Sequence, residues 1–515
     1  MIEFSSPVRK PSPMIVLSTF LAAVLPMVSL AVLASRLGAN EHSDLFIVLF
    51  SVGTTLLGVV TSGAAASAFN PVFSELMHAG QTAQAWKLYR SAVTLATLVF
   101  IPLTFLCWGG ALAIAMLIAP GMQLSIKLNG MEANYYVLGL LVFAQWCVLV
   151  GGFSFGALYA KQVFTLPALP KNLANLGLII GGLFIGTPIS MVAGFAIGAF
   201  LANMVFPIYP LYKSGLSFAP SFDFKILGSV LRRAASLASS FGLAAGFYFA
   251  LQYTLSSAPS GTVTCFFFAW SLVMAPVTVI GGGLALGASA GFSQFFSSRE
   301  EKLLKRQVDG TVRTAVFLTL PVTAALLVMA KPLVGAFLHR GSFDEASVLR
   351  TAEMVRWFAV TIPAWSVYLV MVRMLLVIER SRFLMVQNAI YFVVFAVICL
   401  GMRSSMSLAL NCFFMLGSFS VLVLQRFAFG TSRFDAKAFW ITFGKSAVAS
   451  LGAAAICAAF ALTPLVDYAG PFLLLGCGLT AILAGWAYYF AAKALEVPEA
   501  DLVGRSMIRV QSQPK

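Results

Sequence analysis

Apolar residues run along the chain in continuous stretches of about 20 residues, separated by short polar connections. A helix of that length crosses roughly 30 Å of hydrocarbon. The stretches do not alternate polar with apolar residues, which favours helices over the strands of a membrane barrel. We therefore predict an all-α polytopic membrane protein with about 14 transmembrane helices. The spans lie near residues 14–36, 44–66, 91–118, 134–159, 168–186, 188–208, 231–255, 262–288, 313–338, 353–378, 383–402, 404–425, 440–462 and 470–493.

Composition supports the membrane class and argues against an enzyme. The chain has 515 residues, of which 60% are hydrophobic and 10% charged, whereas a soluble domain carries about 25% charged residues. The polar connections are too short to fold into a catalytic domain. The first apolar run, residues 14–33, has full spanning length, so we interpret it as a retained span and not as a cleaved signal.

The distribution of charge predicts how the chain lies in the membrane. With the N-terminus in the cytoplasm and an even number of spans, the whole net charge of +15 falls on cytoplasmic segments. This is the positive-inside bias, and it places both termini in the cytoplasm. The densest basic loop, around residues 299–313, suits contact with anionic membrane lipids. We therefore do not interpret the basic charge as a nucleic-acid interface.

Cysteine and histidine give no sign of a metal or cofactor. All 7 cysteines fall inside predicted spans and none has a CxxC spacing, so we interpret them as small apolar residues. The 3 histidines are scattered. A phosphate-binding GxxxxGK[ST] loop is missing from the sequence, which argues against direct use of ATP.

The chain repeats itself at one constant offset. Gly63 matches Gly282, Phe73-Ser74 match Phe292-Ser293, Lys87 matches Arg306, and Pro102 matches Pro321, with no gap between them. This offset places the second span on the eighth, so each copy holds six spans and both copies have the same orientation. We predict two parallel six-helix lobes around a central cavity, residues 1–213 and 214–430, followed by two additional helices and a cytoplasmic tail in residues 431–515.

Several residues within the spans suit a bundle that moves. Proline kinks a membrane helix and frees a backbone carbonyl, and glycine allows close approach or bending. Pro26 in the first span, Pro276 in the eighth and Gly282 in the glycine triplet that follows are therefore hinge candidates. Kinked but static packing is the alternative interpretation of the same residues.

Four segments together resemble one known family. They are SRLGANEHSDLF at residues 35–46, SGAAASAFNPVFSE at 62–75, APG at 119–121 and HRGSFD at 339–344. These segments resemble the motifs of the MurJ (MviN-type) lipid II flippases, within the multidrug/oligosaccharidyl-lipid/polysaccharide exporter superfamily. The resemblance implies fourteen spans in two lobes plus two helices, in a bacterial inner membrane. It also implies transfer of an undecaprenyl-diphosphate-linked glycan from the inner to the outer leaflet by alternating access.

The chain departs from this family at the cavity arginines. By position, the arginines that the resemblance implies fall on other residues here, and so do nearby acidic residues, whereas the acidic residue at Asp44 is retained. A diphosphate favours guanidinium partners. The replaced positions are Ala23, Ser29, Leu57, Gly58, Ser62, Trp270, Ser271 and Met274.

The remaining polar residues define the candidate site. Asp44, at the outer start of the second span, can cap that helix, and Arg36 can pair with it as an outer gate. Hydroxyls and amides suit sugars better than phosphates, so we expect lipid II or a less charged exopolysaccharide repeat unit. The substrate or cavity candidates are Ser29, Asp44, Ser62, Arg232, Arg233, Gln252, Ser271 and Arg373.

Two other functions remain open from the sequence. One is a cation-coupled small-molecule exporter of the same superfamily, for which a coupling ion would be a further partner. The spans contain no Asp or Glu deep within them, which argues against coupling of that type. The other is an inactive scaffold derived from a flippase, which the loss of cavity arginines would allow. The sequence does not define an oligomeric state.

Overall fold

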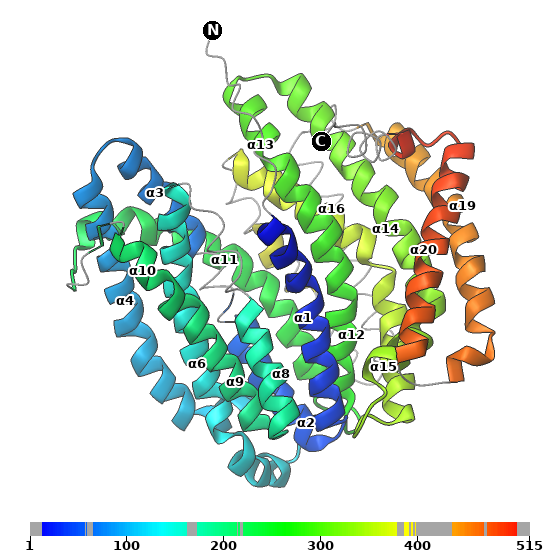
Figure 1. The fold of residues 1–515 in the computed structure, drawn as a ribbon, viewed down its shortest axis with the longest axis horizontal. Helices are drawn as coiled ribbons and strands as arrows, with labels where there is room; N and C mark the ends of the chain where they lie inside the picture. Colours follow the sequence, from blue (N-terminus) through cyan, green and yellow to red (C-terminus); the bar gives the residue numbers. More distant parts are fainter. Residues whose placement is uncertain are drawn as a thin grey trace. The chain divides into compact units, whose positions relative to one another are not determined.

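The computed structural model describes residues 13–56, 58, 65–161, 172–213, 215–216, 220–378, 386–390, 393–394, 397, 435–467 and 471–501 (Figure 1). Every regular element in these ranges is helical, which confirms the predicted all-α class. The chain divides into two compact units. Unit 1 holds Met1–Arg36 and Leu45–Ala245, and unit 2 holds Leu37–Asp44 and Gly246–Lys515. The predicted division at residues 213 and 430 stays a prediction.

The apolar helices confirm a protein that crosses the membrane several times. In the described ranges, 7 helices are long and apolar enough to span a bilayer, and a bent pair with a 53° angle makes an eighth candidate. They fall on predicted spans, while the total of about fourteen stays a prediction. The candidates are Thr82–Ile118, Tyr136–Ala160, Pro188–Lys213, Thr262–Ser297, Glu301–Leu338, Lys437–Ala461, Phe472–Ala494 and the pair Glu345–Ala359 with Ile362–Val377.

Unit 1 is built around α6, which packs against α3, α4 and α9. Phe69 of α3 lies 4.8 Å from Phe153 of α6 between ring centroids, and Phe73 lies 5.5 Å from Trp86 of α4. The elements are α1 (Pro13–Leu37), α2 (Glu41–Ser51), the π-helix η1 (Val52–Leu56), α3 (Ala66–His78), α4 (Thr82–Gly109), α5 (Ala111–Ile118), α6 (Leu124–Ala160), α8 (Leu173–Phe184), α9 (Pro188–Phe200), the π-helix η4 (Leu201–Val205), α10 (Phe206–Lys213) and most of α11 (Phe224–Leu255).

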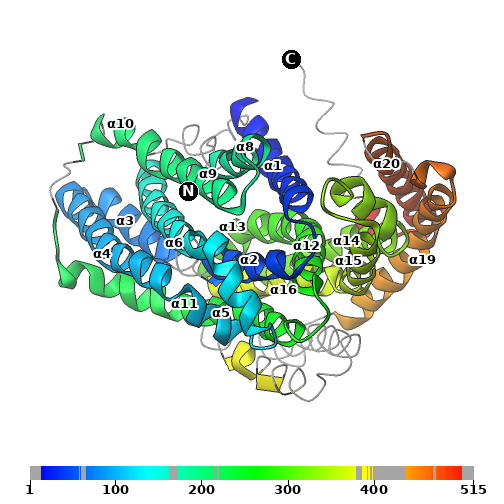
Figure 2. The same cartoon turned by 90° about the horizontal axis from the view of Figure 1, so that it is seen from below.

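Helices α8 and α9 of unit 1 lie side by side and approach through glycine (Figures 1 and 2). A Cβ atom at Gly177 would overlap the carbonyl oxygen of Gly194, and one at Gly194 would overlap that of Gly177. Gly181 meets the Ser190 carbonyl in the same way. The hydrophobic effect does not drive membrane helices together, because lipid is as apolar as their side chains. Close packing at small residues drives their association instead.

This contact predicts a cost for adding one methyl group. Gly177→Ala is expected to lower the free energy of unfolding by about 1–3 kcal/mol, because two backbones have to separate. Gly478→Ala on α20 is the matched control, since nothing lies within 4 Å of its Cβ position. Thermal unfolding of the purified variants measures both. Equal melting temperatures for the two variants would contradict the close approach of α8 and α9.

Unit 2 is built around α14, which contacts α13, α15, α16, α19 and α20. Phe292 of α13 is fully buried in this unit, as its repeat partner Phe73 is in unit 1. The elements are the end of α11, α12 (Thr262–Pro276), the π-helix η5 (Val277–Gly282), α13 (Gly283–Ser297), α14 (Glu301–Leu338), α15 (Glu345–Ala359), α16 (Ile362–Val377), α19 (Ala436–Ala461), the 3₁₀ helix η6 (Pro464–Asp467) and α20 (Pro471–Ala494).

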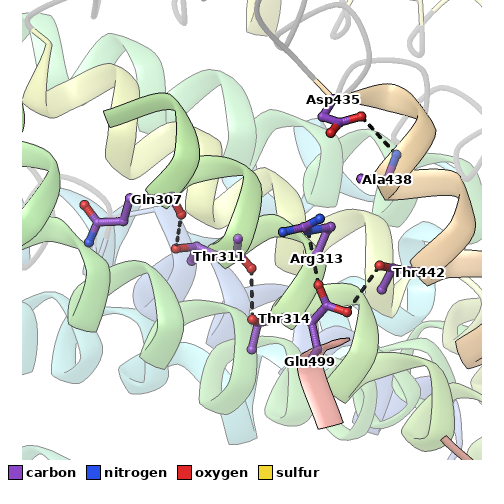
Figure 3. Close-up of polar contacts among 9 residues, drawn as sticks. Gln307, Thr311, Arg313, Thr314, Asp435, Ala438, Thr442 and Glu499 are labelled. Carbon is purple, nitrogen blue, oxygen red and sulfur yellow. Dashed lines mark hydrogen bonds and ion pairs between the residues drawn. The ribbon is translucent and has the colours of Figure 1, made fainter. Parts of the chain in front are cut away.

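The C-terminal helices are tied to α14 by buried polar groups. The Tyr488 hydroxyl of α20 donates to the Phe317 carbonyl at 2.6 Å. Beyond α20, the Glu499 carboxylate lies 3.1 Å from Nε of Arg313 on α14 and accepts a hydrogen bond from the Thr442 hydroxyl of α19 at 3.2 Å (Figure 3). Glu499 is only 2% exposed, so this carboxylate joins three separate segments inside unit 2.

Candidate functional site

The site begins at the turn before α2, residues 37–40. Asn40 caps α2, because its side-chain oxygen accepts hydrogen bonds from the backbone N–H groups of His42 and Ser43, each at 3.0 Å. Gly38 has a positive φ of 63°, and a Cβ there would press against the Ser342 backbone. Because Asn40 caps α2, Asp44 does not cap its own helix, which was one expectation for this residue.

The Asp44 carboxylate instead caps α12. One oxygen accepts from the Gly261 N–H at 2.8 Å, and the other accepts from the Thr264 N–H at 2.8 Å and the Thr264 hydroxyl at 2.6 Å. Asp44 is 5% exposed. The helix's own cap position, Gly261, has no side chain to offer, so the carboxylate satisfies N–H groups that would otherwise be orphaned. This contact lies wholly within unit 2.

A second contact supports the loop before α12. The Arg350 guanidinium of α15 donates to the Ser260 carbonyl at 3.0 Å. Gly261 has a φ of 83°, and a Cβ there would overlap the Ala39 carbonyl. The loop is therefore held on one side by α15 and on the other by residues 39–44, so α12 begins at a fixed point of unit 2.

Arg36 lies in unit 1 at the end of α1. It is exposed, and its guanidinium donates to the Leu183 carbonyl at the end of α8 at 3.1 Å. A positively charged group there complements the negative end of the α8 dipole. Arg36 and Asp44 thus each have a partner within their own unit. The pairing expected between them stays a prediction.

Three of the predicted polar residues are satisfied within the bundle. The Ser29 hydroxyl of α1 donates to the Pro26 carbonyl at 2.8 Å, and Asn175 of α8 lies 3.5 Å away. The Gln252 amide is fully buried and donates to the Tyr248 hydroxyl at 3.3 Å. The half-buried Ser271 hydroxyl donates to the Phe267 carbonyl one turn earlier at 2.8 Å. Pro26 lies inside a continuous α1, and its carbonyl accepts the hydrogen bond from Ser29.

The predicted basic residues lie apart along the chain. Arg232 is exposed on α11, two turns after the helix begins at Phe224. Arg373 is half-buried near the end of α16. The side chain of Arg233 and the whole of Ser62 lie outside the described residues. Their roles at a substrate site stay predictions.

The two hinge candidates of the eighth span flank a change of helix type. Pro276 ends α12, and Gly282 ends the π-helix η5, after which α13 continues as an α-helix. Such π-helical turns insert an extra residue into a helix and occur often at functional sites. Gly281 presses directly against Ser366 of α16. The bending role of this segment stays a prediction.

The described ranges hold no group of three His, Cys, Asp or Glu side chains that could bind a metal ion. Cys265, next to Thr264, packs with its thiol 3.8 Å from the Ser347 carbonyl. Gly261 and Thr264 were not predicted from the sequence as partners of Asp44. The signal available for them was the Pro259-Ser260-Gly261-Thr262 run, which marks a turn and a helix start.

Sequence comparison connects this chain with known flippases. The family model described as "Lipid II flippase MurJ" matches residues 33–474. The protein named "Probable lipid II flippase MurJ" of Buchnera aphidicola subsp. Acyrthosiphon pisum is 21% identical over 362 residues, 68% of this chain and 69% of that protein. A protein of the same name from Vibrio cholerae is 22% identical over 342 residues, 64% of this chain and 65% of the relative.

Solved structures show the same fold. The chain matches "Lipid II flippase MurJ, inward closed conformation" with a TM-score of 0.73 and 18% identity, covering 92% of this chain and 98% of that one. It also matches an inward-facing multidrug resistance MATE family transporter of the MOP superfamily with a TM-score of 0.64 and 13% identity, covering 79% and 96%. With the family model matched over most of its length, the chain belongs to the MurJ family of lipid II flippases.

Proposed function

We propose that this protein moves an undecaprenyl-diphosphate-linked glycan from the inner to the outer leaflet of a bacterial inner membrane by alternating access. Membership of the MurJ family carries this proposal. The MOP superfamily fold and the succession of apolar helices support it. In this proposal both termini lie in the cytoplasm, residues 1–213 and 214–430 form the lobes, and the protein transports its substrate without altering it covalently.

The Asp44 contact serves as the outer gate in this proposal. The carboxylate holds residues 37–44 on the first turn of α12 through three hydrogen bonds. Opening toward the outer side has to break these bonds or move the two segments together. Bending at Pro276 and Gly282, and in α1 at Pro26, accommodates that movement, while Arg36 stabilises the end of α8.

The transport path has to be polar, because an unpaired ion costs tens of kcal/mol in hydrocarbon by the idealised Born estimate. We assign Arg232, Arg233 and Arg373 to the diphosphate. Hydroxyls and amides bind sugars, and we assign Ser29, Ser62 and Ser271 to the glycan. The Gln252 amide is fully buried in this structure, so in this proposal it reaches the glycan after the opening that alternating access provides. This donor set is poorer in charge than the one that the family resemblance implies. An exopolysaccharide repeat unit therefore suits it better than lipid II.

Complementation of conditional MurJ depletion tests the substrate. We expect lysis despite confirmed expression in the membrane, and loss of surface polysaccharide when the gene is deleted from its host. Rescue of growth would overturn the substrate shift and would show that lipid II is carried with this sparser set of cations. Lysis combined with unchanged surface polysaccharide would contradict flippase function and would favour the inactive scaffold.

A further inference from the structure

One face of α4 lines a cavity inside unit 1. The residues on this face recur at the spacing of helical turns, in adjacent pairs. The cavity has a volume of about 410 Å³, within the range of sites that hold small ligands. Its α4 residues are Tyr89, Arg90, Val93, Thr94, Thr97 and Leu98. Residues of α6, η4 and α10 and of the connection after α10 complete the wall.

Arg90 brings a positive charge into this cavity without a visible counter-charge. Its Nε is buried and has no hydrogen-bond partner among the described residues. Among the described residues that line the cavity there is no Asp or Glu. Asp223, on the connection after α10, is taken by Lys87, whose Nζ lies 2.7 Å from the carboxylate. Arg90 as a whole is half-buried, and the guanidinium stays charged while its Nε is shielded from water without a partner, so this site favours an anion.

The rest of the wall favours hydrocarbon. Val93, Val150 and Met204 present apolar surface to the cavity. Leu98 is 61% exposed and Ile208 is 48% exposed, so the apolar wall continues to the outer surface of the unit. Only 17% of the most apolar stretch of the Thr82–Ile118 span is buried by protein. In a membrane this surface lies against acyl chains.

The wall also contains an irregular backbone. Asn203 and Met204 belong to the π-helix η4, a form of helix that often marks functional sites. A Cβ at Gly151 of α6 would overlap the Asn203 side chain, so a glycine is what allows Asn203 its position. Across the cavity, the Tyr89 and Ser154 hydroxyls are bonded to each other at 2.8 Å. Of the described lining residues, Arg90 carries the charge.

We propose that this cavity binds one anionic phospholipid, with its phosphate on the Arg90 guanidinium and an acyl chain along Leu98 and Ile208. None of its lining residues is among those that we assign to the transport path, and its proposed occupant is a resident lipid. A zwitterionic phospholipid fits less well, since the part of the lining that the structure describes offers no acidic side chain to the cationic part of its headgroup.

Native mass spectrometry of the purified full-length protein tests this site without requiring transport. The probes are phosphatidylglycerol, phosphatidylcholine with identical acyl chains, and inorganic phosphate. We expect one phosphatidylglycerol to bind in preference to phosphatidylcholine, with no displacement by inorganic phosphate. Arg90→Gln is expected to weaken this binding about tenfold, as loss of a charge-assisted contact would.

Two further variants complete the test. Thr94→Phe fills the cavity while keeping Arg90, and it is expected to weaken phosphatidylglycerol binding to a similar extent. Arg356→Gln removes the same charge from an exposed position on α15 and is expected to leave the binding unchanged. Equal binding by the Arg90 and Arg356 variants would overturn the proposal. Unchanged binding by Thr94→Phe, equal binding of phosphatidylcholine, or displacement by inorganic phosphate would do the same.

Discussion

Replacing Asp44 with alanine is expected to lower the free energy of unfolding by about 2–4 kcal/mol, because two buried N–H groups of α12 lose their acceptor. The carboxylate is 5% exposed and receives three hydrogen bonds from Gly261 and Thr264. Asp44→Asn keeps the shape but loses the charge, and it is expected to fall between alanine and the native protein. Thermal unfolding in detergent measures both variants.

Asp344 provides the matched control for this substitution. It caps its own helix α15, accepting the Ser347 N–H at 2.9 Å, and this contact holds its pKa below the usual value. Asp344→Ala is expected to cost about 1 kcal/mol, the typical value of a local helix cap. Under the gate proposal only the Asp44 variants also lose function in the host. Equal losses of stability for the two aspartates would contradict a special role of Asp44.

Arg313→Gln is expected to lower the free energy of unfolding by about 3 kcal/mol, because it leaves a buried carboxylate without its counter-charge. Glu499 is 2% exposed, and after the substitution it keeps the hydrogen bond from Thr442 that Figure 3 shows. The residues after α20 are expected to detach from α14 and α19. Limited proteolysis at the C-terminus and thermal unfolding would show this.

Two further variants test whether the buried charge causes the loss of stability in Arg313→Gln. Lys331→Gln breaks an ion pair with Glu345 at 3.5 Å whose side chains are 43% and 67% exposed, and it is expected to cost less than about 1 kcal/mol. The double variant Arg313→Gln/Glu499→Gln removes both charges, so it is expected to be more stable than Arg313→Gln alone. If it is less stable instead, the buried charge is not the cause of the loss.

The membrane helices could be predicted because the bilayer sets both their length and their apolarity. The residues at which these helices begin could not be predicted in the same way. Helix α14 begins at Glu301, well before the predicted start at 313, and α11 begins at Phe224 instead of 231. The additional turns of α14 carry many charged residues, whereas those of α11 carry Lys225 among mainly apolar residues. Hydropathy detects where lipid begins, whereas helix propensity and tertiary packing decide where the helix begins.

The candidate site was predicted less completely. Asp44 was identified through its motif, but its partner Thr264 lies 220 residues away in sequence, and no local pattern connects the two. Gln252 was expected at the substrate, and the structure shows its amide fully buried against Tyr248. Polarity within an apolar span indicates that a partner is required. It does not distinguish a neighbouring side chain from a substrate.

The position of residues 37–44 also has a consequence for biogenesis. These residues belong to unit 2, although unit 1 precedes and follows them in the chain. During translation Asp44 leaves the ribosome long before Thr264, which it caps from 220 residues away. Its carboxylate therefore lacks these partners until α12 has been inserted. Unit 2 therefore cannot mature as an autonomous second half, and no single cut of the gene would yield both units intact.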